Sequence, residues 1–141
     1  MLLAAALAAC AAPAPEPADS SAPDAPAVVD TPRQDLTGDQ ARDEAAVSAL
    51  EQEARRVAVT DGCTSAGQCA AAPVGVKGCG GPRDYVVYCA TATDTAALFR
   101  KLDELARAER AYNERYSVAS DCAMQVAPTV TLVGQSCRVA P

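Results

Sequence analysis

Residues 69–89 read CAAAPVGVKGCGGPRDYVVYC, two apolar runs on either side of a loop that is dense in turn residues. The second run, which ends at Cys89, is rich in aromatic and β-branched residues, and these favour strands. The loop between Lys77 and Arg83 contains three glycines and a proline, a composition typical of a tight chain reversal. The stretch therefore predicts a β-hairpin with strands near 70–76 and 85–89.

A helical pattern lies on each side of this hairpin. Apolar residues recur at helical spacing over about residues 38–59 and again over residues 95–116. Thr37-x-x-Gln40 fits a capping box at the start of the first helix. Asp94 is placed to cap the second helix.

A last strand is expected near residues 129–133, which completes the order α-β-β-α-β. This order predicts an α+β domain in which a small antiparallel sheet is packed with two helices. The chain has no Trp, one Phe and four Tyr, and its apolar content is 50%. Because much of that content is Ala, the hydrophobic core is expected to be thin and to need covalent cross-links.

Six cysteines lie in the region of this predicted domain, at positions 63, 69, 79, 89, 122 and 137. An even number of cysteines favours three disulfides if the chain is exported to an oxidising compartment, which its first residues, considered below, indicate. The closest pair, Cys63 and Cys69, is separated by more residues than the cysteine pairs of structural zinc sites or redox-active dithiols. The sequence therefore predicts no metal site and no cofactor.

The sequence leaves 15 cysteine pairings open, and the expected topology favours one of them. If Val76 faces Asp84 across the loop, Cys69 and Cys89 come together at the open end of the hairpin. The second helix, at ~1.5 Å per residue, is long enough to bring Cys122 back to the Gly-rich loop and to Cys79. Cys63 is then left to pair with Cys137. The expected disulfides are Cys69–Cys89, Cys79–Cys122 and Cys63–Cys137.

Several residues between Cys63 and Cys137 form a recognisable arrangement. They are Cys69, Gly75, Lys77, Cys79-Gly-Gly-Pro82, Tyr85, Tyr88, Asn113, Ser120 and Cys122. The arrangement resembles a group of small bacterial envelope lipoproteins that have a Cys-Gly-Gly-Pro…Tyr-x-x-Tyr core, several disulfides and no assigned activity. The resemblance implies an architecture but no mechanism, and members of the group often have Ser in place of Cys89.

The first residues of the chain resemble a targeting signal. Residues 1–9 are apolar and small, like the second half of a secretory signal peptide. Leu7-Ala-Ala-Cys10 resembles the lipobox of bacterial lipoproteins, which implies a lipid on Cys10 and an anchor in a membrane. Because no basic segment precedes this run, the true start codon is expected upstream of Met1. In lipoproteins of enteric-type bacteria, an Asp directly after the lipidated Cys implies retention at the inner membrane. This chain has Ala11 at that position, so the resemblance implies an anchor in the outer membrane, with the domain facing the periplasm.

Residues 10–36 read as a lipidated cysteine followed by a flexible tether, and residues 37–141 as the domain. The tether contains six prolines, which disfavour both helix and sheet. Most of the net charge of −6 lies before Thr37, where five acidic residues accompany Arg33 alone. A nearly neutral domain on an acidic tether argues against nucleic-acid binding, which needs a clustered basic face.

The chain contains no histidine, which excludes Ser-His-Asp and Cys-His catalysis. The Gly-rich loop lacks the phosphate-binding pattern of a P-loop. Its charged and aromatic residues, Lys77, Arg83, Asp84 and Tyr85, form a possible contact surface. The favoured function is a non-enzymatic, lipid-anchored cell-envelope protein with a binding or structural role toward a target that the sequence does not name. A secreted-protease inhibitor that uses loop 80–85, and an enzyme that uses thiols or carboxylates, remain open as alternatives.

Overall fold

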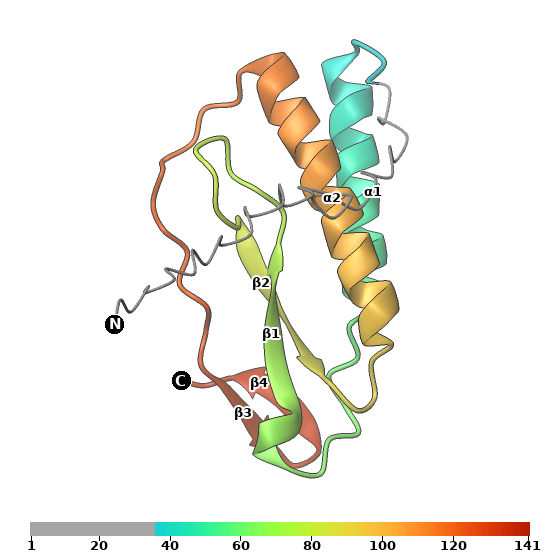
Figure 1. Ribbon diagram of the computed structural model, residues 1–141, viewed down its shortest axis with the longest axis vertical. Coiled ribbons are helices and arrows are strands. Elements are labelled where there is room, and N and C mark those ends of the chain that lie inside the picture. The colour runs from blue at the N-terminus through green and yellow to red at the C-terminus, as the bar shows by residue number, and fades with distance from the viewer. Residues whose placement is uncertain (1–35) are drawn as a thin grey trace, which may run out of the picture. The chain divides into compact units, whose positions relative to one another are not determined.

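The computed structural model describes residues 36–141 (Figure 1). The signal peptide, Cys10 and the tether up to residue 35 therefore lie outside the described residues. The described elements are α1 (Gln40–Val57), the 3₁₀ turn η1 (Ala66–Gln68), β1 (Cys69–Val74), β2 (Asp84–Cys89), α2 (Thr95–Tyr116), β3 (Val130–Val133) and β4 (Ser136–Val139). They confirm a small disulfide-stapled α+β fold, in which the strands form two antiparallel pairs, β1–β2 and β3–β4.

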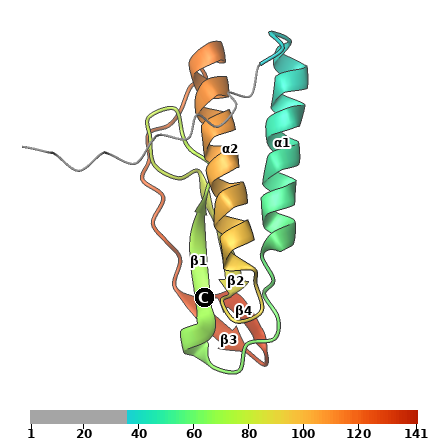
Figure 2. The same cartoon turned by 45° about the vertical axis from the view of Figure 1, so that its right-hand side comes forward.

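The two helices lie side by side and antiparallel, as both cartoon views show (Figures 1 and 2). Helix α2 has the predicted bounds, and the Asp94 side chain accepts a hydrogen bond from the amide of Ala97 at 2.9 Å. Helix α1 is capped by Asp39 rather than by Thr37, because the Thr37 hydroxyl donates to Asp43 instead. Within residues 36–141, neither helix is both long and apolar enough to cross a membrane.

A buried carboxylate, Asp43, joins the start of α1 to the end of α2. It accepts hydrogen bonds from the amide and hydroxyl of Thr37 at 2.8 and 2.7 Å and from the hydroxyl of Tyr116 at 2.6 Å. Burial opposes ionisation, but these hydrogen bonds outweigh it and lower the pKa of Asp43 to about 2. The charged form therefore holds the two helix ends together at neutral pH.

The β1–β2 hairpin is paired two residues away from the predicted register. Val74, rather than Val76, faces Asp84, while Cys69 faces Cys89 at the open end. Strand β1 ends before the predicted residue 76 because side chains of α2 bind both backbone polar groups of Val76. The Val76 amide donates to Glu109, and the Val76 carbonyl accepts from Asn113. The hairpin is thus held against α2 at the point where the Gly-rich loop begins.

The main core lies between the two helices and the hairpin. Leu98 and Leu105 from α2 and Val74 from β1 are fully buried, together with Ala54 from α1. Few large apolar side chains take part, as the composition predicted. A second cluster, at the open end of the hairpin, consists of four buried cysteines packed with residues of β3.

The β3–β4 hairpin contains a strand that the sequence analysis missed. Its strands are four residues long and are joined through Gly134 and Gln135. The amide of Cys137 donates to the carbonyl of Thr60 at 2.8 Å, and the amide of Gly62 donates to the carbonyl of Gln135 at 2.9 Å. These bonds hold the C-terminal hairpin against the chain that follows α1.

The disulfides confirm one predicted pair and correct two. Cys79 is bonded to Cys122 as expected, but Cys63 is bonded to Cys89, and Cys69 to Cys137. The predicted Cys69–Cys89 pair fails even though these residues face each other. Directly opposed strand residues have Cβ atoms ~4.5–5.5 Å apart, whereas a disulfide needs about 3.8 Å. Each cysteine instead bonds to a segment packed beside the hairpin.

Candidate functional site at the hairpin loop

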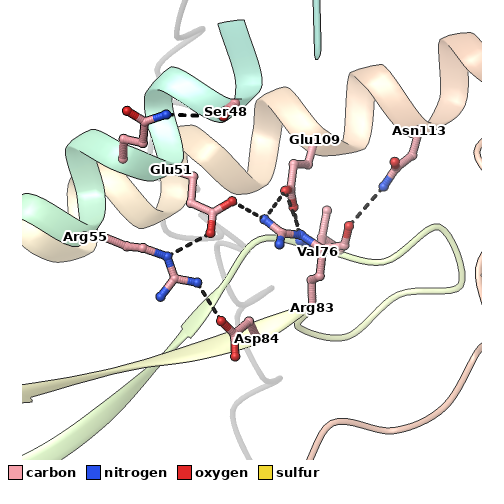
Figure 3. Close-up of polar contacts among 9 residues, drawn as sticks. Ser48, Glu51, Arg55, Val76, Arg83, Asp84, Glu109 and Asn113 are labelled. Atoms are coloured by element: carbon pink, nitrogen blue, oxygen red, sulfur yellow. Dashed lines mark hydrogen bonds and ion pairs between the residues drawn. The ribbon is translucent and has the colours of Figure 1, made fainter. Parts of the chain in front are cut away.

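A row of five alternating charges joins the hairpin to both helices (Figure 3). Asp84 pairs with Arg55 at 2.5 Å, and Arg55 pairs with Glu51 at 2.8 Å. Glu51 then pairs with Arg83 at 2.6 Å, and Arg83 pairs with Glu109 at 2.8 Å. The row begins and ends on different elements, so it fixes the base of the Gly-rich loop relative to α1 and α2.

The innermost charge of the row is Glu109, which is only 6% exposed. One of its oxygens accepts from the Val76 amide at 2.5 Å, and the other accepts from Nε and Nη2 of Arg83 at 3.1 and 2.8 Å. Asn113, one helical turn later, donates to the Val76 carbonyl at 2.9 Å. All these partners belong to the hairpin, so Glu109 and Asn113 hold the entry to the loop (Figure 3).

Gly75 is required at this point for two reasons. Its φ is +65°, a region that residues with a Cβ adopt only at a cost. A Cβ at this position would also overlap the Glu109 carboxylate. The Glu109–Val76 contact therefore depends on the absence of a side chain at residue 75.

Gly75→Ala is expected to lower the free energy of unfolding by about 2–4 kcal/mol, since it adds both backbone strain and overpacking. Gly134→Ala is the matched control, because Gly134 has φ +66° but nothing within 4 Å of its Cβ position. It is expected to cost about 1–2 kcal/mol from backbone strain alone. Urea unfolding followed by circular dichroism measures both values, and equal losses would contradict the close approach of Glu109.

Two carboxylates of the row, Glu51 and Asp84, are poorly matched to proton transfer near neutral pH. Burial would raise the pKa of Glu51, but hydrogen bonds from Arg55 and Arg83 outweigh it and hold the pKa below its usual value. The pKa of Asp84 is lowered in the same way, against burial, by the Tyr85 amide and Arg55. A general acid or base works best with a pKa near the operating pH. The row is therefore a structural clamp.

The Gly-rich loop closes on itself above this clamp. The amide of Lys77 donates to the carbonyl of Gly81 at 3.0 Å, and the amide of Gly80 donates to the carbonyl of Lys77 at 2.9 Å. The φ angles of Gly80 and Gly81 are +88° and +76°, which favour glycine at both positions. Cys79, at the tip, is exposed.

A long segment without helix, strand or turn, residues 118–129, leads from α2 past the loop to β3 (Figure 1). We name this segment the strap. The Cys79–Cys122 disulfide fixes it to the tip of the loop. The ammonium of Lys77 donates to Asp121 and to the carbonyl of Ala123, both at 2.8 Å. The hydroxyl of Tyr85 donates to the carbonyl of Gln125 at 3.5 Å.

Among residues 36–141, the two most exposed large hydrophobic residues lie on the strap. Met124 is 90% exposed and Val126 is 79% exposed. A hollow of about 330 Å³ lies between the strap and the loop. It is lined by Cys79, Gly80, Gly81, Pro82, Cys122, Ala123, Met124 and Gln125. The loop and the strap therefore form one surface, which we name the loop–strap surface.

The four residues that the sequence marked as a possible contact surface all have partners within the domain. Lys77 and Tyr85 hold the strap, while Arg83 and Asp84 belong to the charge row. They support the loop–strap surface from beneath. The exposed residues of the strap were missed because they follow no helical or strand periodicity. The only sequence signal was an apolar pair, Met124 and Val126, in a segment without predicted structure.

The buried cysteine cluster contains a group with the geometry of a metal site. The sulfur atoms of Cys63, Cys69 and Cys137 lie within 4.8 Å of one another. Each of these sulfurs belongs to a disulfide, whereas a cysteine binds a metal as a free thiolate. In this oxidised form the cluster is a covalent part of the core.

No protein-family model, curated protein or solved structure matches this chain.

Proposed function

We propose that this chain is a non-enzymatic, lipid-anchored protein of the bacterial cell envelope that binds another envelope or periplasmic protein through the loop–strap surface. The anchor is the lipid on Cys10, inserted in the outer membrane from the periplasmic side. Residues 11–35 then separate the domain from the membrane. Leu7-Ala-Ala-Cys10 supports the lipid anchor, and Ala11 supports the outer-membrane location.

The observation that carries the binding role is the exposure of Met124 and Val126 on a segment that is fixed in place. Apolar groups on a loose loop lose entropy when a partner orders them. The strap is already held by the Cys79–Cys122 disulfide and by Lys77, so docking on it costs less entropy.

The chemistry of the described residues also favours binding over catalysis. The six cysteines of residues 36–141 all lie in disulfides, so none is a free thiolate nucleophile. The carboxylates Glu51 and Asp84 have pKa values below their usual range. Their arginine partners keep them charged, which suits a rigid frame.

The proposal is tested in cells that express the chain from its native start codon. A photo-crosslinking amino acid at position 124 is expected to trap a discrete partner. The same residue analogue at Val133, which is also exposed but lies on β3, is the matched control. Equal crosslinking at both positions, or none at position 124, would contradict the binding surface.

The anchor has its own readout in the same cells. Labelled palmitate is expected to be incorporated into the wild-type chain, which should then partition into detergent. Cys10→Ser should lose both properties while the domain remains folded. Label retained by Cys10→Ser would rule out lipidation at this position.

A further inference from the structure

The contacts of the strap lie symmetrically around one residue. The carbonyl of Ala123, just before Met124, accepts from Lys77, and the carbonyl of Gln125, just after it, accepts from Tyr85. Cys122 is tied to the loop one residue further back. Met124 itself is 90% exposed. The domain thus holds the backbone on both sides of Met124 and leaves its side chain free.

The support beneath Met124 is rigid. The side chain of Lys77 is only 10% exposed, and its ammonium is held between Asp121 and the Ala123 carbonyl. Lys77 and Tyr85 lie at the two ends of the Gly-rich loop. The residue before each of them is fixed: the Val76 amide donates to Glu109, and Asp84 pairs with Arg55. Movement of the strap would require this arrangement to open.

The neighbouring loop leaves the approach to Met124 clear. Gly80 and Gly81 have no side chains, and nothing lies within 4 Å of their Cβ positions. Val126, two residues further along the strap, is also largely exposed and is available to the same partner. A partner that reads a short, presented peptide segment can therefore reach it without a clash from the loop.

We propose that the strap is a substrate-like inhibitory segment that occupies the cleft of a serine endoprotease with an apolar primary specificity pocket. Met124 fills that pocket, because its unbranched side chain adapts to an apolar cavity. Val126 adds a second apolar contact beyond it. The inference rests on the proposed function, since it assigns a class of partner to the loop–strap surface. Inhibition requires no covalent step, since a pre-ordered segment binds without the entropy cost of ordering a flexible substrate.

The test uses the full chain against chymotrypsin, subtilisin and trypsin in peptide-hydrolysis assays. Chymotrypsin and subtilisin, which have apolar pockets, are expected to be inhibited. Met124→Asp should weaken inhibition by at least about 100-fold, as expected for a central anchor of an interface. Met124→Lys should transfer inhibition to trypsin. Val133→Asp, an equally simple exchange at an exposed site outside the strap, should leave inhibition unchanged.

A second variant tests the support. Lys77→Met keeps the aliphatic stem and removes the donor to the Ala123 carbonyl. The chain should then be cleaved after Met124 at least about 10-fold faster than the wild type, because the strap is no longer pre-ordered. A thermal melt of each variant confirms that the domain is folded.

The inference is overturned if folded wild-type chain inhibits neither chymotrypsin nor subtilisin, or if Met124→Asp inhibits as well as wild type. Failure of Met124→Lys to inhibit trypsin would also overturn it. These results differ from a failure of the proposed function. A crosslink from position 124 to a protein that is not a protease would remove the inhibitor assignment and leave the binding role in place.

Discussion

Reduction of the disulfides is expected to unfold the domain at room temperature or to bring its thermal midpoint close to it. Each disulfide that closes a loop of this kind contributes ~2–4 kcal/mol, and a typical domain has only ~5–15 kcal/mol in total. The core supplies little beyond Leu98, Leu105 and Val74 as large, fully buried apolar side chains. Circular dichroism melts with and without a phosphine reductant measure the change. A midpoint that does not move would show that the core alone is sufficient.

Paired substitutions separate the contributions of individual disulfides. Loss of Cys69–Cys137 removes a buried link between β1 and β4, so the double Ala variant should lose about 3–5 kcal/mol. Loss of Cys79–Cys122 frees only the exposed strap. That variant should keep most of its stability, because the released strap gains entropy in the folded state. Equal losses from urea titration would favour a purely chain-entropic effect, since both disulfides close long loops.

Glu109→Ala is expected to lower the free energy of unfolding by about 2–3 kcal/mol. The substitution leaves the part-buried amide of Val76 without its acceptor and takes a partner from Arg83. Arg83 is itself partly exposed and keeps its ion pair with Glu51, so the loss of its ion pair with Glu109 costs little stability. The unpaired amide therefore accounts for most of the effect.

Two controls sharpen this result. Glu109→Gln keeps one acceptor oxygen for Val76 but presents an amide group to Arg83, so it should cost about 1–2 kcal/mol. Glu114→Ala, at an exposed position on the same helix, should change stability by no more than ~0.5 kcal/mol. Urea unfolding measures all three. A loss for Glu109→Ala no larger than for Glu114→Ala would show that the contact to Val76 contributes nothing.

The sequence predicted the parts of the fold that depend on local signals. Helix α2 has its predicted bounds because Leu98, Leu102 and Leu105 repeat on one face and all become buried. Asp94 marks its start. Strand β4 was missed because Ser136–Val139 is too short for a periodic pattern. The two-residue connection through Gly134, between two β-prone runs, is the signal that could have found it.

The candidate site depended on contacts that local signals do not encode. The sequence marked Arg83 and Asp84 as part of a possible contact surface. In the structure, Glu51, Arg55 and Glu109 reach them from two helices and pair with them. Only the three-dimensional packing of α1 and α2 places these partners beside the loop. The same holds for Lys77, whose partners lie on the strap, more than 40 residues away in sequence.

The cysteine connectivity has a consequence for how the chain matures. None of the three disulfides joins cysteines that are neighbours in sequence; the native pairs are 26, 68 and 43 residues apart. Short loops close with the lowest entropic cost, so a chain that oxidises before it folds first joins neighbours such as Cys63 and Cys69. Those bonds must be broken and exchanged before Cys69 can pair with Cys137, 68 residues further along the chain. When oxidation precedes folding, we therefore expect the yield of the native domain to be set by disulfide isomerisation rather than by the speed of oxidation.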